Sequence, residues 1–88
     1  MCGLVGLLLK EKKHNYNFFN QMVNTISHRG PDYTDTWISE DNKVLLGHTR
    51  LSILDLSKNG NQPMTSFSGR YVIIYNGEIY NHLEIRKL

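Results

Sequence analysis

The sequence has little of what membrane, secreted and nucleic-acid-binding proteins use. Its single cysteine cannot form an internal disulfide, which fits a reducing cytosol. No apolar run approaches the ~20 residues that span a bilayer, and basic residues follow the first apolar stretch, whereas a secretory signal has them before it. The net charge of +2 is spread among acidic residues, as on an ordinary solvated surface. We therefore predict a cytoplasmic protein with neither nucleic acid nor membrane as a partner.

The usual residue spacings of metal and nucleotide sites are also missing. Cys2, His28 and His48 could supply three ligands, but they lack the close paired spacing of a zinc site. Gly3 and Gly6 lie in an apolar stretch, and no lysine followed by serine or threonine completes a phosphate-binding loop. We therefore expect no metal and no cofactor in this segment.

What the sequence does have is a cysteine directly after its first residue. If Met1 is removed, as we expect, Cys2 carries both a thiol and a free α-amine. An α-amine has a pKa near ~8 and can accept a proton at neutral pH, so such a nucleophile has its own base. The alternative is that Cys2 is a small buried hydrophobe, which is the commoner role of a lone cysteine.

The hydrophobic pattern predicts a mixture of strands and helices. Residues 2–9 are apolar on both faces, so we expect a central, buried strand. Asn15 can cap a helix. Two strands, residues 34–39 and 44–48, are expected around a polar turn, and a third in residues 70–75. The apolar positions that recur at helical spacing after Asn15 are Phe19, Met22, Val23 and Ile26.

Asn76-Gly77 ends the last of these extended stretches. Asn-Gly is the strongest short signal for a tight hairpin, but no matching strand follows. Instead, Asn81 begins the capping-box pattern of a helix, with Ile85 and Leu88 expected to face its core. The alternative to a hairpin is a donor pair, because a side-chain amide and a glycine N–H can stabilise the oxyanion of an acyl-transfer intermediate.

Arg50 follows the second strand of the predicted pair. An arginine beside an apolar strand is commonly a surface residue. Its planar guanidinium also suits bidentate capture of a carboxylate. Both interpretations stay open on the residues alone.

Five short motifs follow one another along the chain. They are Met-Cys-Gly-Leu-Val-Gly at 1–6, His-Arg-Gly-Pro-Asp at 28–32, Gly-His-Thr-Arg-Leu-Ser-Ile-Leu-Asp at 47–55, Gln-Pro-Met at 62–64 and Asn-Gly-Glu-Ile-Tyr-Asn at 76–81. This ordered set resembles the start of the glutaminase domain of glutamine-hydrolysing asparagine synthetases. These are class II glutamine amidotransferases, within the N-terminal-nucleophile hydrolases. The resemblance covers essentially the whole chain.

The resemblance implies roles for individual residues. Cys2 would be the nucleophile and its freed α-amine the general base, and Asn76 with the Gly77 N–H would form the oxyanion hole. Arg50 would hold the α-carboxylate of glutamine, and Glu78 its α-amino end. Residues 28–32 would form a structural loop near the site. The remaining glutamine-binding residues would be Leu51, Ser52, Ile53 and Leu54.

The resemblance also implies the fold and the reaction. The fold would be α+β, part of a four-layer αββα sandwich with antiparallel sheets. Residues 1–88 would be a partial glutamine amidotransferase type 2 domain, without its C-terminal part and without the synthetase domain. Glutamine would be hydrolysed, and its ammonia would pass to the synthetase domain of the same chain, which uses ATP and Mg²⁺ to make asparagine from aspartate. The resemblance allows a homodimer.

Two alternatives stay open. One is another class II amidotransferase with a different acceptor, and the other is a truncated product without activity. We expect the 88-residue segment alone to have little or no glutaminase activity, because a strand such as 70–75 is apolar enough to need neighbours on both sides.

Overall fold

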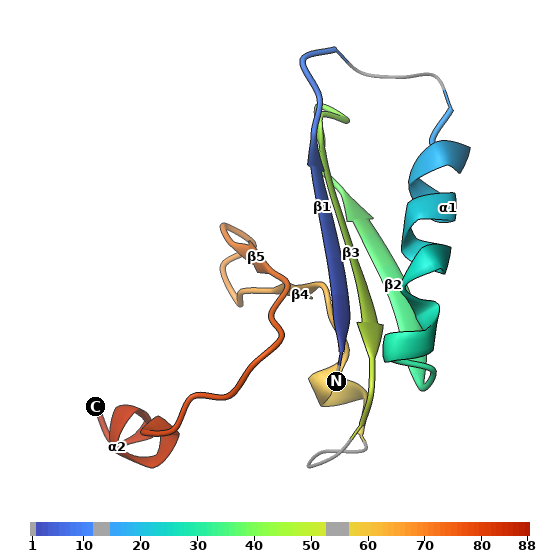
Figure 1. Cartoon of the computed structure of the whole chain (residues 1–88). Helices are drawn as coiled ribbons and strands as arrows, with labels where there is room; N and C mark the ends of the chain where they lie inside the picture. The colour runs from blue at the N-terminus through green and yellow to red at the C-terminus, as the bar shows by residue number, and fades with distance from the viewer. Residues whose placement is uncertain (1, 12–14, 53–56) are drawn as a thin grey trace.

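The computed structural model describes residues 2–11, 15–52 and 57–88. Its main feature is a three-stranded antiparallel sheet with the strand order β1-β3-β2 (Figure 1). The strands are β1 (Gly3–Leu8), β2 (Tyr33–Ile38) and β3 (Val44–Arg50). The predicted pair of strands around a polar turn is confirmed, with β3 running on as far as Arg50.

A short polar turn joins β2 to β3. Ser39 Oγ donates to Asp41 Oδ1 at 2.6 Å, and the same carboxylate oxygen accepts from the Lys43 N–H at 3.1 Å. These two bonds hold the pKa of Asp41 below its usual value. The turn therefore has its own local hydrogen bonds, which help to set the register that pairs Trp37 with Leu46.

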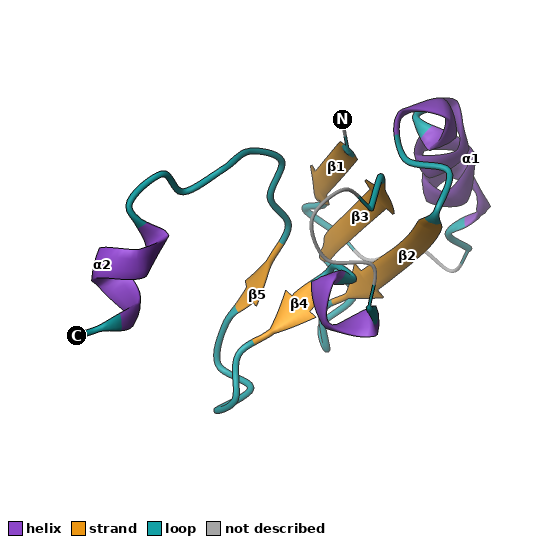
Figure 2. Cartoon of the chain, turned by 90° about the horizontal axis from the view of Figure 1, so that it is seen from below, coloured by secondary structure: helices purple, strands orange, loops and turns teal. Residues whose placement is uncertain are grey.

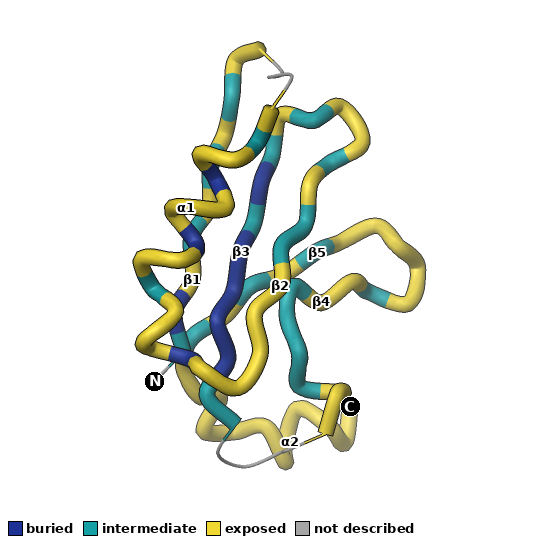
Figure 3. The backbone as a smooth tube through the Cα atoms, turned by 90° about the vertical axis from the view of Figure 1, so that its right-hand side faces the viewer, coloured by how far each residue is buried: buried dark blue, intermediate teal, exposed yellow. Residues whose placement is uncertain are grey.

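Helix α1 (Asn17–Thr25) covers one face of the sheet (Figure 3). Phe19 and Val23 are buried against Leu45 of β3 and form the centre of the core. The predicted helical spacing is confirmed at these two positions. Gly47 permits the close packing, because a Cβ there would lie only 2.7 Å from Val23 Cγ2.

The predicted start of this helix is close to the observed one. Asn15 Oδ1 accepts a hydrogen bond at 2.8 Å from the N–H of Asn17, the first helical residue. The N-cap itself is Tyr16, whose side chain makes no capping bond. After α1, a single 3₁₀ turn, η1 (Ser27–Arg29), leads into the loop before β2.

The prediction that residues 2–9 form a central strand buried on both faces is wrong. β1 lies at an edge of the sheet, and β3 is central. Leu4 and Leu8 of β1 are 45% and 80% exposed. The reason is that α1 covers only one face of the sheet, and on the opposite face the described segments leave these two leucines largely in contact with solvent.

The prediction of a strand over residues 70–75 is correct only for its centre. β5 (Val72–Ile73) pairs with β4 (Met64–Thr65) in a second, two-stranded antiparallel sheet. Before β4 come a 3₁₀ turn, η2 (Lys58–Gly60), and a cis peptide bond between Gln62 and Pro63. Ile73 is 53% exposed, so this strand is not an interior one.

Helix α2 (His82–Arg86) stands apart from the main sheet (Figure 2). A helix was predicted here, but the capping box of Asn81 and Glu84 is not formed, because Asn81 makes no side-chain capping bond. The expectation that Ile85 and Leu88 face a core is also wrong: both are exposed. None of the described segments packs over them.

The chain is α+β with antiparallel sheets, as predicted. Its described residues form one helix layer on one three-stranded sheet, with a small second sheet beside it (Figure 2). They do not form a four-layer sandwich. None of the helices in the described ranges has the length and apolarity needed to cross a membrane.

Candidate functional site

The thiol of Cys2 lies at the C-terminal end of β3. The Leu51 N–H donates to Cys2 Sγ at 3.3 Å, and Sγ lies 3.8 Å from the Leu51 carbonyl oxygen. Cys2 is half-buried, not enclosed. Side chains alternate between the two faces along a strand, and Gly3 pairs with Thr49. The residues next to this pair, Cys2 and Arg50, therefore share the other face of the sheet, opposite α1.

The loop of residues 28–32 is hydrogen-bonded both to Cys2 and to the end of β3. Arg29 Nε donates to the Cys2 carbonyl oxygen at 3.4 Å. The Asp32 N–H donates to the Arg50 carbonyl oxygen at 3.0 Å, and Asp32 Oδ2 accepts from the Ser52 N–H at 2.7 Å. The loop thus contacts both the cysteine and the segment after β3, which agrees with the structural role that the resemblance implies.

Gly30 makes the close approach of this loop possible. It is buried, and a Cβ placed on it would lie 2.1 Å from the Thr49 carbonyl oxygen and 2.5 Å from the Arg50 nitrogen. Both neighbours are backbone atoms, which cannot turn away as a side chain can. Only glycine fits here without moving the loop from β3.

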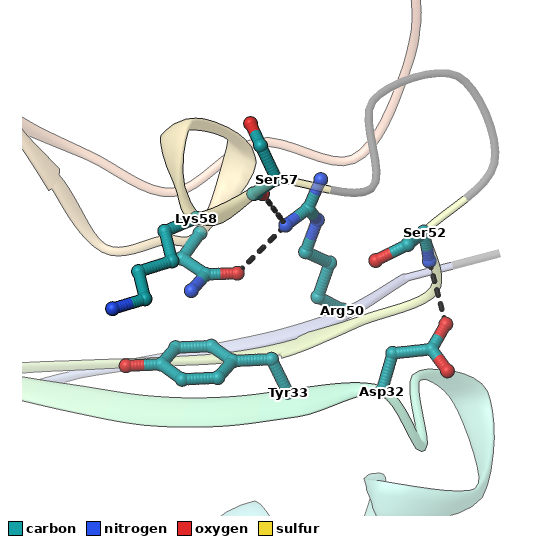
Figure 4. Close-up of a pocket in the computed structure, with 7 residues that line it drawn as sticks. Asp32, Tyr33, Arg50, Ser52, Ser57 and Lys58 are labelled. Carbon is teal, nitrogen blue, oxygen red and sulfur yellow. Dashed lines mark hydrogen bonds between the residues drawn. The ribbon is translucent and has the colours of Figure 1, made fainter.

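Arg50 is buried, with an exposed fraction of 7%, so the interpretation of it as a surface residue is wrong. Its Nη1 donates to the Ser57 carbonyl oxygen and to Asn61 Oδ1, the latter at 2.7 Å (Figure 4). Gly60 lies against the guanidinium, since a Cβ there would be 2.3 Å from Nη2. The segment 57–61 therefore holds the guanidinium in one orientation.

A pocket of about 330 Å³ opens beside this guanidinium. Hydroxyl, amide and charged side chains line it, from the start of β2 and the loop before it, from the end of β3 and the residue beyond Leu51, and from η2 and the residues on either side of η2 (Figure 4). It has the size of a small-molecule site. The lining residues are Asp32, Tyr33, Arg50, Ser52, Ser57, Lys58 and Asn61.

The segment that contains Asn76 and Gly77 reaches the sheet through Tyr75. The Tyr75 carbonyl oxygen lies 3.3 Å from His48 Nε2, and the Tyr75 N–H donates to Gln62 Oε1 at 2.6 Å. Asn76 is half-buried, whereas Gly77 and Glu78 are exposed. The chain then continues into α2 and not into a strand, so Asn76-Gly77 is not a hairpin turn.

The structure thus brings together only part of the predicted site. Cys2, Arg50, Leu51 and Ser52 meet at one end of β3. No hydrogen bond among the described residues joins Cys2 to the segment 76–78. The predictions for Met1, Ile53 and Leu54 concern residues outside the described ranges.

The sequence pattern of the glutamine amidotransferase domain matches residues 1–88, the whole length of the chain. The chain belongs to this family.

Curated relatives of this amidotransferase domain are similar over nearly all of it. Asparagine synthetase [glutamine-hydrolyzing] 3 of Bacillus subtilis is 40% identical over 99% of the chain, and asparagine synthetase [glutamine-hydrolyzing] 1 of Saccharomyces cerevisiae is 39% identical over 99%. The chain spans 14% and 15% of these two proteins. Amidase chry2 of Gibberella zeae is 47% identical over 68% of the chain, which spans 9% of that protein. No solved structure matches.

Several residues of the site have a place that was not predicted. Ser57, Gly60 and Asn61 surround the Arg50 guanidinium, although no role for any of them was predicted from the sequence. Gln62 was part of a motif, but no role followed from it. The only sequence signal for this contact was the Gly-Asn-Gln-Pro run at 60–63. Its residues favour turns, and a turn there can bring the chain back towards Arg50.

The described part of this amidotransferase domain holds no group of three or more histidine, cysteine or acidic side chains that could bind a metal ion. Around Cys2 and the pocket it gathers hydroxyls, an amide, a thiol and a guanidinium, together with the Asp32 carboxylate and the Lys58 amine. Such groups suit recognition of a small polar molecule by hydrogen bonds and charge.

His48 is fully buried on the same sheet face as Arg50. Burial lowers the pKa of His48 below its ordinary value of 6.5, and the positive charge of Arg50 lowers it further, whereas the bond to the Tyr75 carbonyl acts in the opposite direction. Its Nδ1 is buried without a hydrogen-bond partner. The neutral ring is therefore the native form at neutral pH.

This burial predicts a loss of stability in mild acid. The unfolded chain takes up a proton on His48 near pH 6.5, whereas the native state does so only at lower pH. As the pH falls below about 6.5, the unfolded state binds more protons than the native state, so the free energy of unfolding falls. Urea unfolding from pH 7.5 down to about 5 measures the slope. His48→Asn should flatten it, while His82→Asn, at an exposed position, should not; an unchanged slope in both would contradict the prediction.

Proposed function

We propose that this domain hydrolyses the side-chain amide of glutamine and supplies the ammonia to an asparagine synthetase reaction. The observation that carries the proposal is the placement of the Cys2 thiol on the same sheet face as the buried Arg50, in a chain that belongs to the glutamine amidotransferase family. The relatives named glutamine-hydrolyzing asparagine synthetase support the choice of acceptor.

In the proposed reaction, the Cys2 sulfur attacks the amide carbon after its proton passes to the α-amine freed by removal of Met1. The carbonyl oxygen becomes an oxyanion, which Asn76 Nδ2 and the Gly77 N–H would stabilise. The C–N bond then breaks, and the protonated amine gives its proton to the leaving nitrogen, so that ammonia and a glutamyl thioester form. Water, deprotonated by the same amine, splits the thioester into glutamate and the free thiol.

Arg50 is proposed to bind the α-carboxylate of glutamine from the adjoining pocket. Its guanidinium is already oriented by Ser57 and Asn61, so little conformational freedom remains to be lost on binding. Leu51 and Ser52 would line the neighbouring wall, and Glu78 would meet the α-amino group. Ile53 and Leu54 complete the proposed glutamine site.

The rest of the proposal concerns a longer protein. The complete domain would be a four-layer αββα sandwich, and a separate synthetase domain of the same chain would bind ATP and Mg²⁺ and use the ammonia. We place this protein in the cytoplasm. We also propose that the 88-residue chain alone has little glutaminase activity, because it leaves Leu4 and Leu8 of β1 45% and 80% exposed.

The similarity to a protein named amidase chry2 favours a second candidate. In it, the same glutamine-hydrolysing site delivers ammonia to an acceptor other than aspartate. Both candidates share every step at Cys2. Product analysis with aspartate and ATP as co-substrates distinguishes them.

Replacement of Arg50 by lysine tests the binding half of the proposal. In the full-length protein, Arg50→Lys should raise the KM for glutamine by about 10-fold or more, because a point charge cannot replace the bidentate fork. The kcat should change less, since the α-carboxylate is bound equally in substrate and transition state. Steady-state glutaminase assays measure both constants.

Arg70→Lys is the matched control. Arg70 is exposed and stacks on the Tyr71 ring at 5.3 Å, away from the pocket lining. It should leave both constants unchanged. A glutamine KM that Arg50→Lys does not move would show that Arg50 has a purely structural role.

A further inference from the structure

Two side chains from distant parts of the chain bind the backbone carbonyl and the backbone N–H of one residue, Tyr75. His48 lies on the central strand β3, and Gln62 lies before β4. His48 Nε2 is 3.3 Å from the Tyr75 carbonyl oxygen, and Gln62 Oε1 is 2.6 Å from the Tyr75 nitrogen. The residue after Tyr75 is Asn76, to which the proposed function gives an oxyanion-stabilising role.

The chemistry of these bonds assigns the tautomer of His48. A carbonyl oxygen can only accept, so His48 Nε2 must carry the hydrogen and donate it. Its Nδ1 is then a bare acceptor, and that atom is buried without a partner. A proton on Nδ1 would be a second buried donor with nothing to bind, near the charge of Arg50. His48 therefore serves as a neutral donor.

The position of His48 in the sheet links Tyr75 to Cys2. His48 pairs with Leu4 of β1, two positions along the strand from Cys2 and on the same face by alternation. A carbonyl bound to His48 thus lies over the face that carries the thiol. The Tyr75 phenol also lies against Gly77, because a Cβ at Gly77 would be 2.8 Å from the phenol oxygen.

We propose that His48 and Gln62 are positioning residues, which bind the Tyr75 backbone and so hold the Asn76-Gly77 donors over the sheet face of Cys2. This inference rests on the proposed function. Neither side chain touches the reacting atoms; both act through the backbone of Tyr75. A donor pair for an oxyanion must be held to within a fraction of an ångström, and no other described hydrogen bond ties residues 74–77 to the rest of the chain.

The test replaces Gln62 by leucine in the full-length protein. Leucine has no acceptor for the Tyr75 N–H, so kcat for glutamine hydrolysis should fall by about 10-fold or more, with the KM for glutamine little changed because the oxyanion exists only in the transition state. Gln62→Glu should recover most of the lost kcat, because a carboxylate oxygen also accepts. Gln21→Leu, the same change at an exposed position of α1, should have no effect.

A second readout separates positioning from loss of structure. The alkylation of Cys2 by iodoacetamide needs the thiol but no oxyanion donors, so Gln62→Leu should leave its rate unchanged. Tyr75 amide hydrogen exchange should accelerate in Gln62→Leu. His48→Phe, which keeps a ring but removes the donor, should lower kcat in the same way as Gln62→Leu.

The outcomes are distinct. A wild-type protein that does not turn over glutamine would defeat the proposed function, whatever the variants do. A wild-type protein that is active, with kcat of Gln62→Leu within about twofold of it, would overturn the positioning role alone. Equal slowing of turnover and alkylation would also overturn it, because the variant would then have disturbed the thiol itself.

Discussion

Glutamine hydrolysis is expected to disappear when Cys2 is replaced by alanine. The loss should be several orders of magnitude, as is usual when a covalent nucleophile is removed. The reason is that Cys2 is the only cysteine among residues 1–88, and its sulfur lies beside Leu51 on the face of Arg50. No other side chain among these 88 residues carries a thiol that could form the thioester. A glutaminase assay of the full-length protein measures the loss.

Synthesis from added ammonia is the internal control for Cys2→Ala. If the protein is an asparagine synthetase, ammonia bypasses the amide-splitting step, so ammonia-dependent synthesis should be retained while glutamine-dependent synthesis is lost. Loss of both would mean that Cys2 matters for folding or for the synthetase reaction. Retained glutamine hydrolysis would remove Cys2 from the mechanism.

Gly30→Ala is expected to have the largest effect on stability. The added methyl group would overlap the Thr49 carbonyl oxygen, at 2.1 Å, so the loop must move off β3. The bonds of Asp32 to Arg50 and Ser52 would then be lost or distorted. We expect a loss of about 3 kcal/mol or more in the free energy of unfolding, as for severe overpacking. Urea unfolding followed by circular dichroism measures it.

Gly6→Ala is the matched control for this substitution. Gly6 lies on β1, and a Cβ there would meet only Leu46 Cδ2 at an ordinary 3.5 Å. The same methyl group should therefore cost little. If Gly30→Ala is as stable as Gly6→Ala, the loop does not need to approach β3 so closely.

Local patterns predicted the parts of the fold that local interactions determine. The β2–β3 pair has its own polar turn, and α1 has Phe19 and Val23 on one face at helical spacing, so both could be predicted from neighbouring residues. The order of motifs also predicted that Cys2, Arg50 and Leu51 belong to one site. Strand register then brings these residues together.

What the sequence could not show is which elements cover which. The apolar run 2–9 predicted a buried strand, but burial depends on a second layer, and the described residues place α1 on one face only. Ile85 and Leu88 were misplaced for the same reason. The depth of Arg50 depends on Gly60 and Asn61, whose approach to it is a tertiary contact with no local periodicity.

Because side chains alternate along β1, the sheet face on which the thiol lies depends on whether its distance in sequence from a core residue is odd or even. Leu7 packs against the core under α1, and Cys2 lies five positions before it; because this separation is odd, the two side chains must face opposite sides of the sheet. Deleting or inserting one residue between them would keep the apolar character of the strand and yet turn the sulfur towards the helix. The count of residues from the chain start to the core is therefore as strict a requirement for the proposed chemistry as the cysteine itself.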